Sequence, residues 1–501
     1  MNRLVTAVIL LLAGLALTIP SFSLRAAPAP ERPNILFILT DDLDARSIAF
    51  MPNLKALLID RGTTFSNFFV TYALCCPSRA SILRGQYPHN HQILTNTPPT
   101  GGFARFQALG HEQSTVAVWL KSAGYRTVLL GKYLNGYPDR DALTHVPPGW
   151  DEWYSPAGDR AYGNYNYRLN ENGRLVDYGN RPEAYLTDVM ARKTTDAIRR
   201  ARQDGKPFFV YLATYVPHAP ATPAPRHQGT FATATAPRSP SFNEADVSDK
   251  PEFVRSRNEL APRVMEQIDE HYRRRLQSLQ AVDDLIASLV EVLQAQGEFQ
   301  RTYIVFTSDN GFHLGEHRLP AGKNTPYEED IRVPMIVRGP GVPEGRTLSH
   351  MALNIDFAPT FAELAGVTAP GFVDGRSLVP LLGSAPMTLD RWRQAFMVEH
   401  YTRGQPAGAQ PVRSLQRQRG ADAIPAYQAF RVREYVYVEY ATGERELYDL
   451  VKDPFELQNQ YASADQALIG QLRSYLATLR RCAGASCRAA EDTPVPSAAG
   501  R

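Results

Sequence analysis

Acidic and basic side chains stand directly after four short apolar segments of this 501-residue chain. Each segment has the composition of a buried β-strand, and in an open α/β sheet ligands bind outside the carboxyl ends of the strands. The side chains that follow the four segments are Asp41 and Asp42, Lys132, His218, and Asp309 and Asn310. Any one of them could be a helix cap or a turn residue, but together they predict one polar site at an edge of a sheet.

The acidic members of this set predict a bound metal ion. Two acidic pairs held side by side would repel each other and raise each other's pKa, so a divalent cation between them is expected. Carboxylate oxygens and an amide carbonyl suit Ca²⁺, with Mg²⁺ as the less favoured choice. Zinc is not expected at this place, because no Cys/His set has the usual spacing and His89 and His91 are typical of a turn.

Positively charged side chains are expected around the same point. Lys132 and His218 follow two of the apolar segments, and Lys323 lies a short way downstream of Asp309. A cation, two lysines and a histidine together describe a site for the oxygens of an anionic ester, with proton donors at hand.

The chain has four cysteines: Cys75, Cys76, Cys482 and Cys487. Adjacent cysteines cannot easily bridge each other, whereas the C-terminal pair can close a small loop by itself. Pro77 suits the first turn of a helix, so Cys75 would lie just before a helix N-terminus, where the dipole favours a thiolate or a bound oxyanion. Disulfides from the adjacent pair to the C-terminal pair are the structural alternative.

Short β-branched segments alternate with helical stretches, which is the pattern of a mostly parallel sheet covered on both faces. The predicted strands are 34–39, 127–131, 208–213, 303–307 and 333–339. Helices are predicted over 114–124 and 272–297, the latter with apolar residues at helical spacing. The Pro- and Ala-rich stretch 219–250 is expected to be a long loop, either a disordered excursion or part of a cleft rim.

Composition divides the chain into four parts. Residues 1–27 read as a secretory signal peptide, with a charged start, an apolar run and small residues at the end. Residues 33–385 form the α/β domain, and residues 386–481 form a smaller α+β domain with an antiparallel hairpin and a closing helix. The tail, 482–501, is expected to be disordered.

The predicted signal peptide indicates a periplasmic or extracellular protein. Its apolar run falls short of a full span, so no stable membrane span is expected after cleavage, and an uncleaved anchor is the alternative. The chain carries 54 Lys and Arg against 51 Asp and Glu and no long basic run, so nucleic acid is not expected as a partner.

The segment CCPSRASILRG, residues 75–85, resembles the signature C-x-P-S-R of the sulfatase family, whose first cysteine is converted after translation to Cα-formylglycine. Five further segments resemble sulfatase motifs in the same order: PNILFILTDD, GYRTVLLGKY, FTSDNGFHLGEH, KNTPYEEDIRVPMIVRGPG and ELYDLVKDPFELQN. The resemblance implies an alkaline-phosphatase-like fold, in which a mostly parallel mixed sheet is flanked by helices. It also implies a sulfuric ester hydrolase that is matured by a formylglycine-generating enzyme.

By this resemblance Cys75 is the modified residue and Cys76 fills the variable position. The calcium ligands that it implies are Asp41, Asp42, Asp309, Asn310 and an oxygen of modified Cys75. Arg79 would orient and stabilise the formylglycine hydrate. The side chains that would grip the sulfate or protonate the leaving oxygen are Lys132, His218 and Lys323.

An aldehyde hydrate suits this reaction because its second hydroxyl can expel the sulfate, whereas a thiol or an alcohol would leave a stable sulfated enzyme. One position departs from the family pattern. Many arylsulfatases have a histidine two positions after the first lysine, where this chain has Leu134. His313 is the candidate to assist sulfate release instead, and a packed structural histidine is the equal alternative.

Several segments resemble most the branch that holds the N-acetylglucosamine-6-sulfatases and the heparan endosulfatases: CCPSR, GKYLN, PPGWDEWY, VEHY and YVYVEY. The long basic insertion of the endosulfatases is absent. The expected substrate is therefore a sulfated carbohydrate, a 6-O-sulfated N-acetylglucosamine in a glycosaminoglycan. The alternatives are an aryl or choline sulfate, a phosphonate or phosphodiester, and a non-catalytic glycan-binding protein that keeps the fold.

Overall fold

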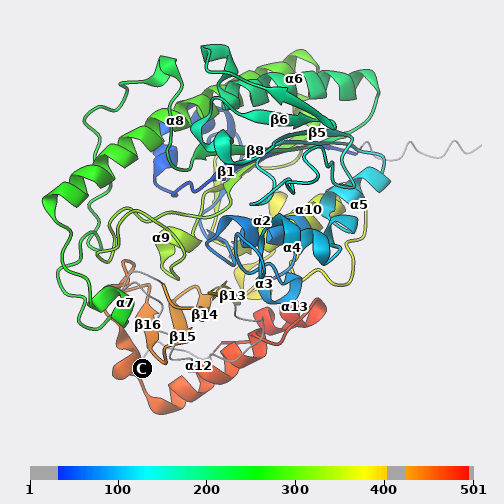
Figure 1. Cartoon of the computed structure of the whole chain (residues 1–501). Coiled ribbons are helices and arrows are strands. Elements are labelled where there is room, and N and C mark those ends of the chain that lie inside the picture. The colour runs from blue at the N-terminus through cyan, green and yellow to red at the C-terminus, as the bar shows by residue number, and fades with distance from the viewer. Residues whose placement is uncertain (1–31, 403–423, 496–501) are drawn as a thin grey trace, which may run out of the picture. The chain divides into compact units, whose positions relative to one another are not determined.

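The computed structural model describes residues 32–402 and 424–495, and its main layer is a ten-stranded sheet in the order β11-β2-β10-β9-β1-β8-β4-β5-β6-β7 (Figure 1). Its strands are β1 Asn34–Asp41, β2 Thr63–Phe65, β4 Arg126–Gly131, β5 Glu152–Pro156, β6 Arg168–Glu171, β7 Arg174–Asp177, β8 Phe208–Pro217, β9 Thr302–Ser308, β10 Met335–Arg338 and β11 Arg346–Leu348. The central strands from β9 to β5 run parallel, and β10, β6 and β7 pair antiparallel. This mostly parallel mixed sheet confirms the predicted fold class.

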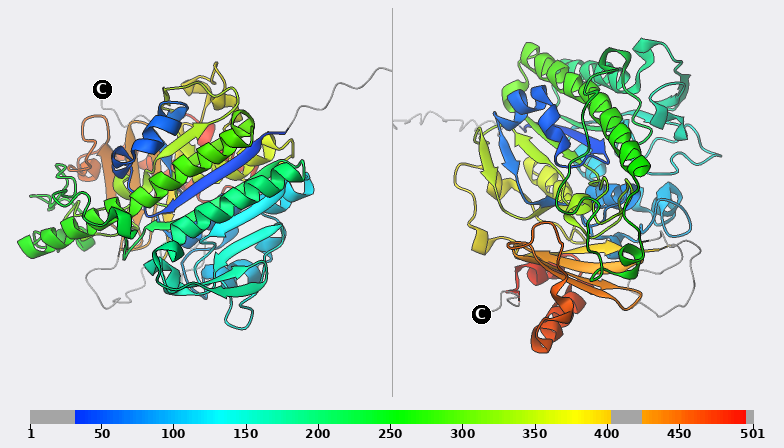
Figure 2. Two further views of the ribbon diagram at one scale, coloured as in Figure 1. Left: turned by 90° about the horizontal axis from the view of Figure 1, so that it is seen from above. Right: turned by 90° about the vertical axis from the view of Figure 1, so that its left-hand side faces the viewer.

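Helices cover both faces of the sheet. One face carries α6 Leu186–Gln203 and α8 Pro262–Ala295, which lie side by side (Figure 2). The other face carries α2 Cys75–Arg84, α4 Gly102–Ala108, α5 Val116–Ser122 and α10 Phe357–Leu364. The helix predicted over 272–297 is longer than expected, because it begins ten residues earlier at a proline, which is favoured in the first turn.

The side chains of β1 alternate between these two layers, as the period of a strand requires. Leu36 and Ile38 are fully buried in the core on the α6 and α8 side. Phe37 faces the opposite way, and its ring lies 4.9 Å from that of Phe357 and 5.3 Å from that of Phe361 on α10. A strand that is apolar on both faces belongs in the middle of a helix-covered sheet, where β1 lies.

A second, antiparallel sheet follows near the C-terminus, in the order β13-β14-β15-β16 (Figure 1). Its strands are β13 Ala395–His400, β14 Tyr427–Val432, β15 Tyr435–Tyr440 and β16 Arg445–Asp449. Helix α12, Gln466–Leu479, packs against β13 and β14. The predicted hairpin and closing helix are both present, and the hairpin is part of a larger four-stranded sheet.

The prediction of a disordered tail was wrong for the part of it that the structure describes. Helix α13 spans Ala485–Asp492, and Cys482 and Cys487 form a disulfide. Cys75 and Cys76 are free, so the alternative that they bridge to the C-terminal pair was wrong too. The composition of these residues resembles that of a linker. They are ordered by the short ring that the disulfide closes and by the packing of α13 on the C-terminal sheet.

Residues 1–31, which include the predicted signal peptide, lie outside the described residues. Among the residues described, no helix has the length and apolar character needed to cross a membrane. The long stretch 219–250 has no strand and only a single 3₁₀ turn, at Pro225–His227. The stretch is therefore a long loop with a defined path, as one of the two alternatives predicted, and the alternative of a disordered excursion was wrong. The domain boundary at residue 385 stays a prediction.

Candidate active site

Four neighbouring parallel strands, β4, β8, β1 and β9, end at one edge of the main sheet. The residues that follow or close these strands are those predicted from the sequence: Lys132, His218, Asp41 with Asp42, and Asp309 with Asn310. The chain turns sharply after β1, where Asp42 adopts a φ of 65° in the left-handed region. Strand order therefore brings together side chains that are far apart in the sequence.

Helix α2 adds Cys75 to this edge. Cys75 is the first residue of the helix, after Leu74 in extended conformation, and not the residue before it as expected. Its Sγ lies 3.5 Å from Asp41 Oδ1 and 3.9 Å from Asp42 Oδ1. Cys76 is buried in the hydrophobic core instead. Only the first of the two adjacent cysteines is thus placed for chemistry at the strand ends.

The carboxylates fit a hard divalent cation. Ligand atoms of Asp41, Asp42, Cys75 and His218 all lie within 4.8 Å of one another. Asn310 donates its Nδ2 to Asp42 Oδ1 at 2.7 Å, while its Oδ1 is buried without a hydrogen-bond partner among the residues described. An unpartnered amide oxygen beside buried carboxylates is the donor set that Ca²⁺ takes.

Asp309 lies at the same point, held on both oxygens. Its Oδ1 accepts the backbone N–H of Asp42 at 3.1 Å, and its Oδ2 accepts Arg79 Nε at 2.8 Å. Burial raises the pKa of Asp309, and the neighbouring Asp41 raises it further in spite of Arg79. This carboxyl needs additional positive charge nearby to stay ionised, which a metal ion would supply.

Two lysines neutralise the other carboxylates. Lys132 Nζ lies 2.6 Å from Asp41 Oδ2, and Lys323 forms an ion pair with Asp42 and lies 2.8 Å from Cys75 Sγ. Burial alone would raise the pKa of Asp41, but Lys132 and the other cations hold it well below its usual value. Burial would lower the pKa of both lysines, yet the carboxylates keep both above the ordinary value. Both ammonium groups therefore stay charged.

Arg79 ties helix α2 to two strand ends. Its side chain is fully buried, and besides the bond to Asp309 it donates Nη1 to the carbonyl oxygen of Lys132 at 2.8 Å. Its Nη2 has no hydrogen-bond partner among the residues described and lies 3.9 Å from Asp41 Oδ1. A buried guanidinium with one free edge is placed to donate to an oxygen in the site.

The thiol of Cys75 is poorly suited to be a nucleophile. Burial raises its pKa to about 12, although Lys132 and Lys323 act in the opposite direction. At neutral pH the group is therefore a thiol and not a thiolate, and the thiolate is the nucleophilic form. Two lysines and a helix N-terminus surround a group that is inert as cysteine, which indicates that the site is built for something other than thiol chemistry.

His218 faces the site with one defined ring nitrogen. Its Nδ1 lies 2.8 Å from the carbonyl oxygen of Ala219, so it carries the proton, and its Nε2 lies 3.6 Å from Asp42 Oδ2. Its ring centroid lies 4.6 Å from that of Tyr162, with the two planes tilted by 46°, and the Tyr162 centroid also lies 5.1 Å from Lys132 Nζ. Tyr162 was not predicted from the sequence, because it comes from a 3₁₀ turn, Asp159–Gly163, that no apolar segment precedes.

His313 is placed differently from the other predicted residues. Its Nδ1 lies 2.9 Å from Asp330 Oδ1, and its backbone pairs with Gly322, next to Lys323. Asp330 also accepts the backbone N–H of Thr325 at 2.8 Å. These contacts give His313 a supporting position under the loop that carries Lys323, and a direct role in sulfate release stays a prediction.

Comparison with known proteins identifies the family of the chain. The model of the sulfatase family matches residues 33–367, and the model of the C-terminal region of N-sulphoglucosamine sulphohydrolase matches residues 315–482. N-acetylglucosamine-6-sulfatase of Capra hircus is 36% identical over 486 residues, which are 92% of this chain and 86% of that protein. The extracellular sulfatase SULF-1 homolog of Drosophila melanogaster is 38% identical over 74% of this chain and 33% of its own length.

A solved structure, described as a complex with its substrate D-glucosamine-2-N,6-O-disulfate, superimposes with a TM-score of 0.74 at 25% identity and covers 89% of this chain and 97% of its own. The family model matches more than half of the chain, and the relatives named above are sulfatases as well. The chain belongs to the sulfatase family and is a sulfuric ester hydrolase.

Proposed function

We propose that this sulfatase removes the 6-O-sulfate of N-acetylglucosamine or glucosamine units in a sulfated glycan such as a glycosaminoglycan. Two relatives named N-acetylglucosamine-6-sulfatase support this substrate, and their similarity to this chain extends over 92% of its length. The disulfated glucosamine held by the superimposed structure supports the same class of sugar. Aryl, choline and phosphonate esters are the alternatives that the assay below must separate.

We propose further that Cys75 is converted to formylglycine and that this residue is the nucleophile. The observation that carries this is the position of Cys75: a buried thiol with a raised pKa, in contact with Lys323 and Asp41 at the N-terminus of a helix. The hydrated aldehyde would supply one hydroxyl for attack on sulfur and a second whose deprotonation releases the sulfate. Maturation then requires a formylglycine-generating enzyme in the host.

The proposed metal is Ca²⁺, held by Asp41, Asp42, Asp309 and Asn310 together with an oxygen of the modified Cys75. The unpartnered Asn310 Oδ1 and the raised pKa of Asp309 support these ligands. Bound there, the ion would supply positive charge to a sulfuryl oxygen and to the nucleophilic hydroxyl.

The remaining roles follow from atom positions. Lys132 and Lys323 hold two positive charges next to the carboxylates and would bind sulfate oxygens, whose charge grows in the transition state. His218, with Nδ1–H fixed by a carbonyl, presents Nε2 to the site, and in its imidazolium form, with a proton on both nitrogens, it would give the Nε2 proton to the departing alcohol. The free edge of Arg79 would orient the hydrate.

Export is part of the same proposal. Residues 1–27 would act as a signal peptide and direct the protein to the periplasm or the outside of the cell, where sulfated glycans occur. The relatives described as extracellular sulfatases support this placement.

The experiment that tests the proposal is a substrate panel with enzyme produced beside a formylglycine-generating enzyme. The panel holds 6-O-, 4-O- and 3-O-sulfated N-acetylglucosamine, 2-N-sulfated glucosamine, an aryl sulfate, choline sulfate and a phosphonate monoester. We expect the highest kcat/KM on the 6-O-sulfate, with roughly a hundredfold or more over the position isomers, because misplacing the ester moves it away from the nucleophile. A higher kcat/KM on the 2-N-sulfate, the aryl sulfate, the choline sulfate or the phosphonate would show that the proposed substrate is wrong. It would not contradict the proposed catalytic site.

A further inference from the structure

A second cluster of metal-ligating side chains lies apart from the strand ends. A ring nitrogen of His317, a carboxylate oxygen of Glu329 and a carboxylate oxygen of Glu456 all lie within 4.8 Å of one another. His317 comes from the loop after β9, Glu329 from the short helix α9, Glu328–Ile331, and Glu456 from the loop after β16. His317 and Glu456 are each only 1% exposed. Three separate segments therefore converge on one buried point.

The histidine of this cluster has the environment of a metal ligand. Its Nδ1 lies 2.7 Å from Glu244 Oε2, and Glu244 is in turn 3.2 Å from Lys250 Nζ. Because the carboxylate of Glu244 holds a proton on Nδ1, the lone pair is on Nε2. That Nε2 is buried and has no hydrogen-bond partner in the part of the chain that the structure describes. Histidines that bind metals usually donate their other ring N–H to a carboxylate in this way.

The two carboxylates of the cluster lack close positive partners. Glu456 accepts the backbone N–H of Glu328 at 2.9 Å, and no lysine or arginine of the described residues pairs with it. The cation beside Glu329 is Arg46, whose Nη2 is 3.9 Å away and whose Nη1 lies closer, at 3.4 Å, to Glu316. Glu456 is thus a buried carboxylate without a nearby cation, which is costly, and a metal ion bound between it and the half-buried Glu329 would remove that cost.

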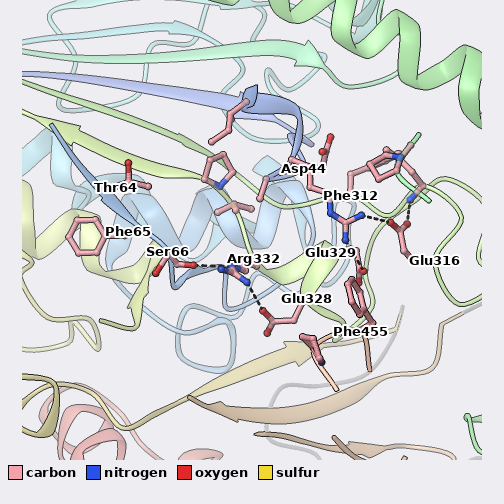
Figure 3. A pocket seen from close by; sticks show the side chains of 18 residues that line it. Asp44, Thr64, Phe65, Ser66, Phe312, Glu316, Glu328, Glu329, Arg332 and Phe455 are labelled. Atoms are coloured by element: carbon pink, nitrogen blue, oxygen red, sulfur yellow. Dashed lines mark hydrogen bonds and ion pairs between the residues drawn. The ribbon is translucent and has the colours of Figure 1, made fainter. Parts of the chain in front are cut away.

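A cavity of about 480 Å³ gives access to the cluster. Glu329, Glu316 and Phe455, the neighbour of Glu456, line it (Figure 3). Arg46 lines it as well. Of the three clustered side chains Glu329 alone lines the cavity, so an ion would enter the cluster past Glu329, and the neighbouring carboxylates of Glu316 and Glu328 would favour a cation there.

We propose that His317 Nε2, Glu329 and Glu456 bind a Zn²⁺ ion, separate from the strand-end metal site. One imidazole with two carboxylates is a ligand set that Zn²⁺ takes, with a water in the fourth position, whereas Ca²⁺ prefers oxygen alone. Zn²⁺ at this point would join the loop that carries Asp309 and Lys323 to α9 and to the C-terminal sheet. The ion would thereby stiffen the loop that positions Lys323.

The test uses full-length protein stripped of metal with a chelator and then kept in excess Ca²⁺, so that the strand-end site is saturated. Zn²⁺ is added, and bound zinc is measured by equilibrium dialysis with elemental analysis, alongside the thermal midpoint. We expect about one equivalent of bound Zn²⁺ per chain and a rise in the midpoint, as for any ligand that binds only the folded state. His317→Gln and Glu456→Gln should each lose both effects.

The matched control is His350→Gln. His350 is likewise a buried histidine, 5% exposed, with Nε2 at 2.7 Å from the carbonyl oxygen of Met387 and no place in the cluster. It should bind zinc as the unaltered protein does, and so should Asp309→Asn, which disables only the strand-end site. No bound zinc in excess Ca²⁺, or equal zinc in His317→Gln and unaltered protein, would overturn the proposal.

A spectroscopic measurement on the unaltered protein decides the matter if the cluster variants do not fold. X-ray absorption at the zinc edge should show one imidazole among oxygen donors. A spectrum with a sulfur ligand, or with no imidazole, would place the ion elsewhere and contradict the proposal.

Discussion

Replacing Lys323 with alanine removes a cation that touches both the carboxylate of Asp42 and the Sγ position of Cys75. The ammonium lies 2.8 Å from Cys75 Sγ, so a sulfuryl oxygen transferred to this residue would lie within about 4 Å of the positive charge. At about 4 Å and an effective dielectric constant of about 20, two unit charges interact by about 4 kcal/mol. That energy corresponds to roughly a thousandfold in rate. Water that enters the space left by the ammonium group would stabilise part of the transition-state charge, so the observed loss should be smaller.

We therefore expect kcat to fall by about a hundredfold to a thousandfold in Lys323→Ala. Because Asp42 keeps the pKa of Lys323 above its usual value despite burial, the deficit should be the same at pH 6 and at pH 8. The assay is turnover of the sulfated sugar, normalised to the formylglycine content of each preparation, with a thermal melt to check folding. Lys193→Ala is the matched control, since Lys193 also pairs with a carboxylate, Glu171 Oε2 at 2.7 Å, but away from the site. A folded Lys323→Ala enzyme within about threefold of the unaltered turnover would refute the reasoning.

Three further predictions concern the same site. Asp309→Asn should lose Ca²⁺ binding by calorimetry together with turnover, because it removes a buried carboxylate charge while keeping the shape that contacts Arg79; retained activity in chelated Asp309→Asn protein would exclude this ligand. Tyr162→Ala should lower kcat by roughly tenfold and alter its pH profile, since the ring packs on His218, whereas Tyr162→Phe should stay close to the unaltered enzyme; equal losses in both would show that the hydroxyl matters and not the ring. In protein made without the modifying enzyme, the Cys75 thiol should resist iodoacetamide at pH 8 until the chain unfolds, because burial raises its pKa to about 12, and fast labelling of the folded protein would contradict that environment.

The strand-end part of the site could be predicted from the sequence because each residue directly follows a recognisable apolar segment. Asp41, Lys132 and Asp309 are such cases: the strand is visible in the letters, and the rule for ligand sites in parallel sheets says which end matters. Lys323 follows no strand and was placed only by its position a short way downstream of Asp309, and Arg79 has no local sign at all, so the resemblance to a family motif was needed to find it.

Tyr162 and the C-terminal tail show what local patterns miss. Tyr162 reaches the site from a 3₁₀ turn between two strands, and nothing in its neighbourhood distinguishes it from the many other tyrosines of the chain. The tail looked like a linker by composition, yet tertiary contacts order it: Glu491 on α13 accepts a hydrogen bond from the buried Arg393 at 2.8 Å. Long-range partners of this kind carry no periodic signal.

The cluster of His317, Glu329 and Glu456 could not be predicted from the sequence either. His317 stands in the same motif as Asp309, but its partners Glu244 and Glu456 come from segments 73 residues upstream and far downstream, in the C-terminal sheet region. Spacing rules for zinc ligands assume pairs that are close in sequence, so they cannot find a cluster that joins the loop after β9 and α9 to the distant loop after β16.

The conversion of Cys75 is the central claim, and one measurement tests it most directly. Peptide mass spectrometry of the segment 75–84, from enzyme made with the modifying enzyme present, should find formylglycine in place of Cys75 and an unmodified Cys76, and turnover across preparations should rise in proportion to the formylglycine content. Fully active enzyme in which Cys75 is still a thiol would contradict the account.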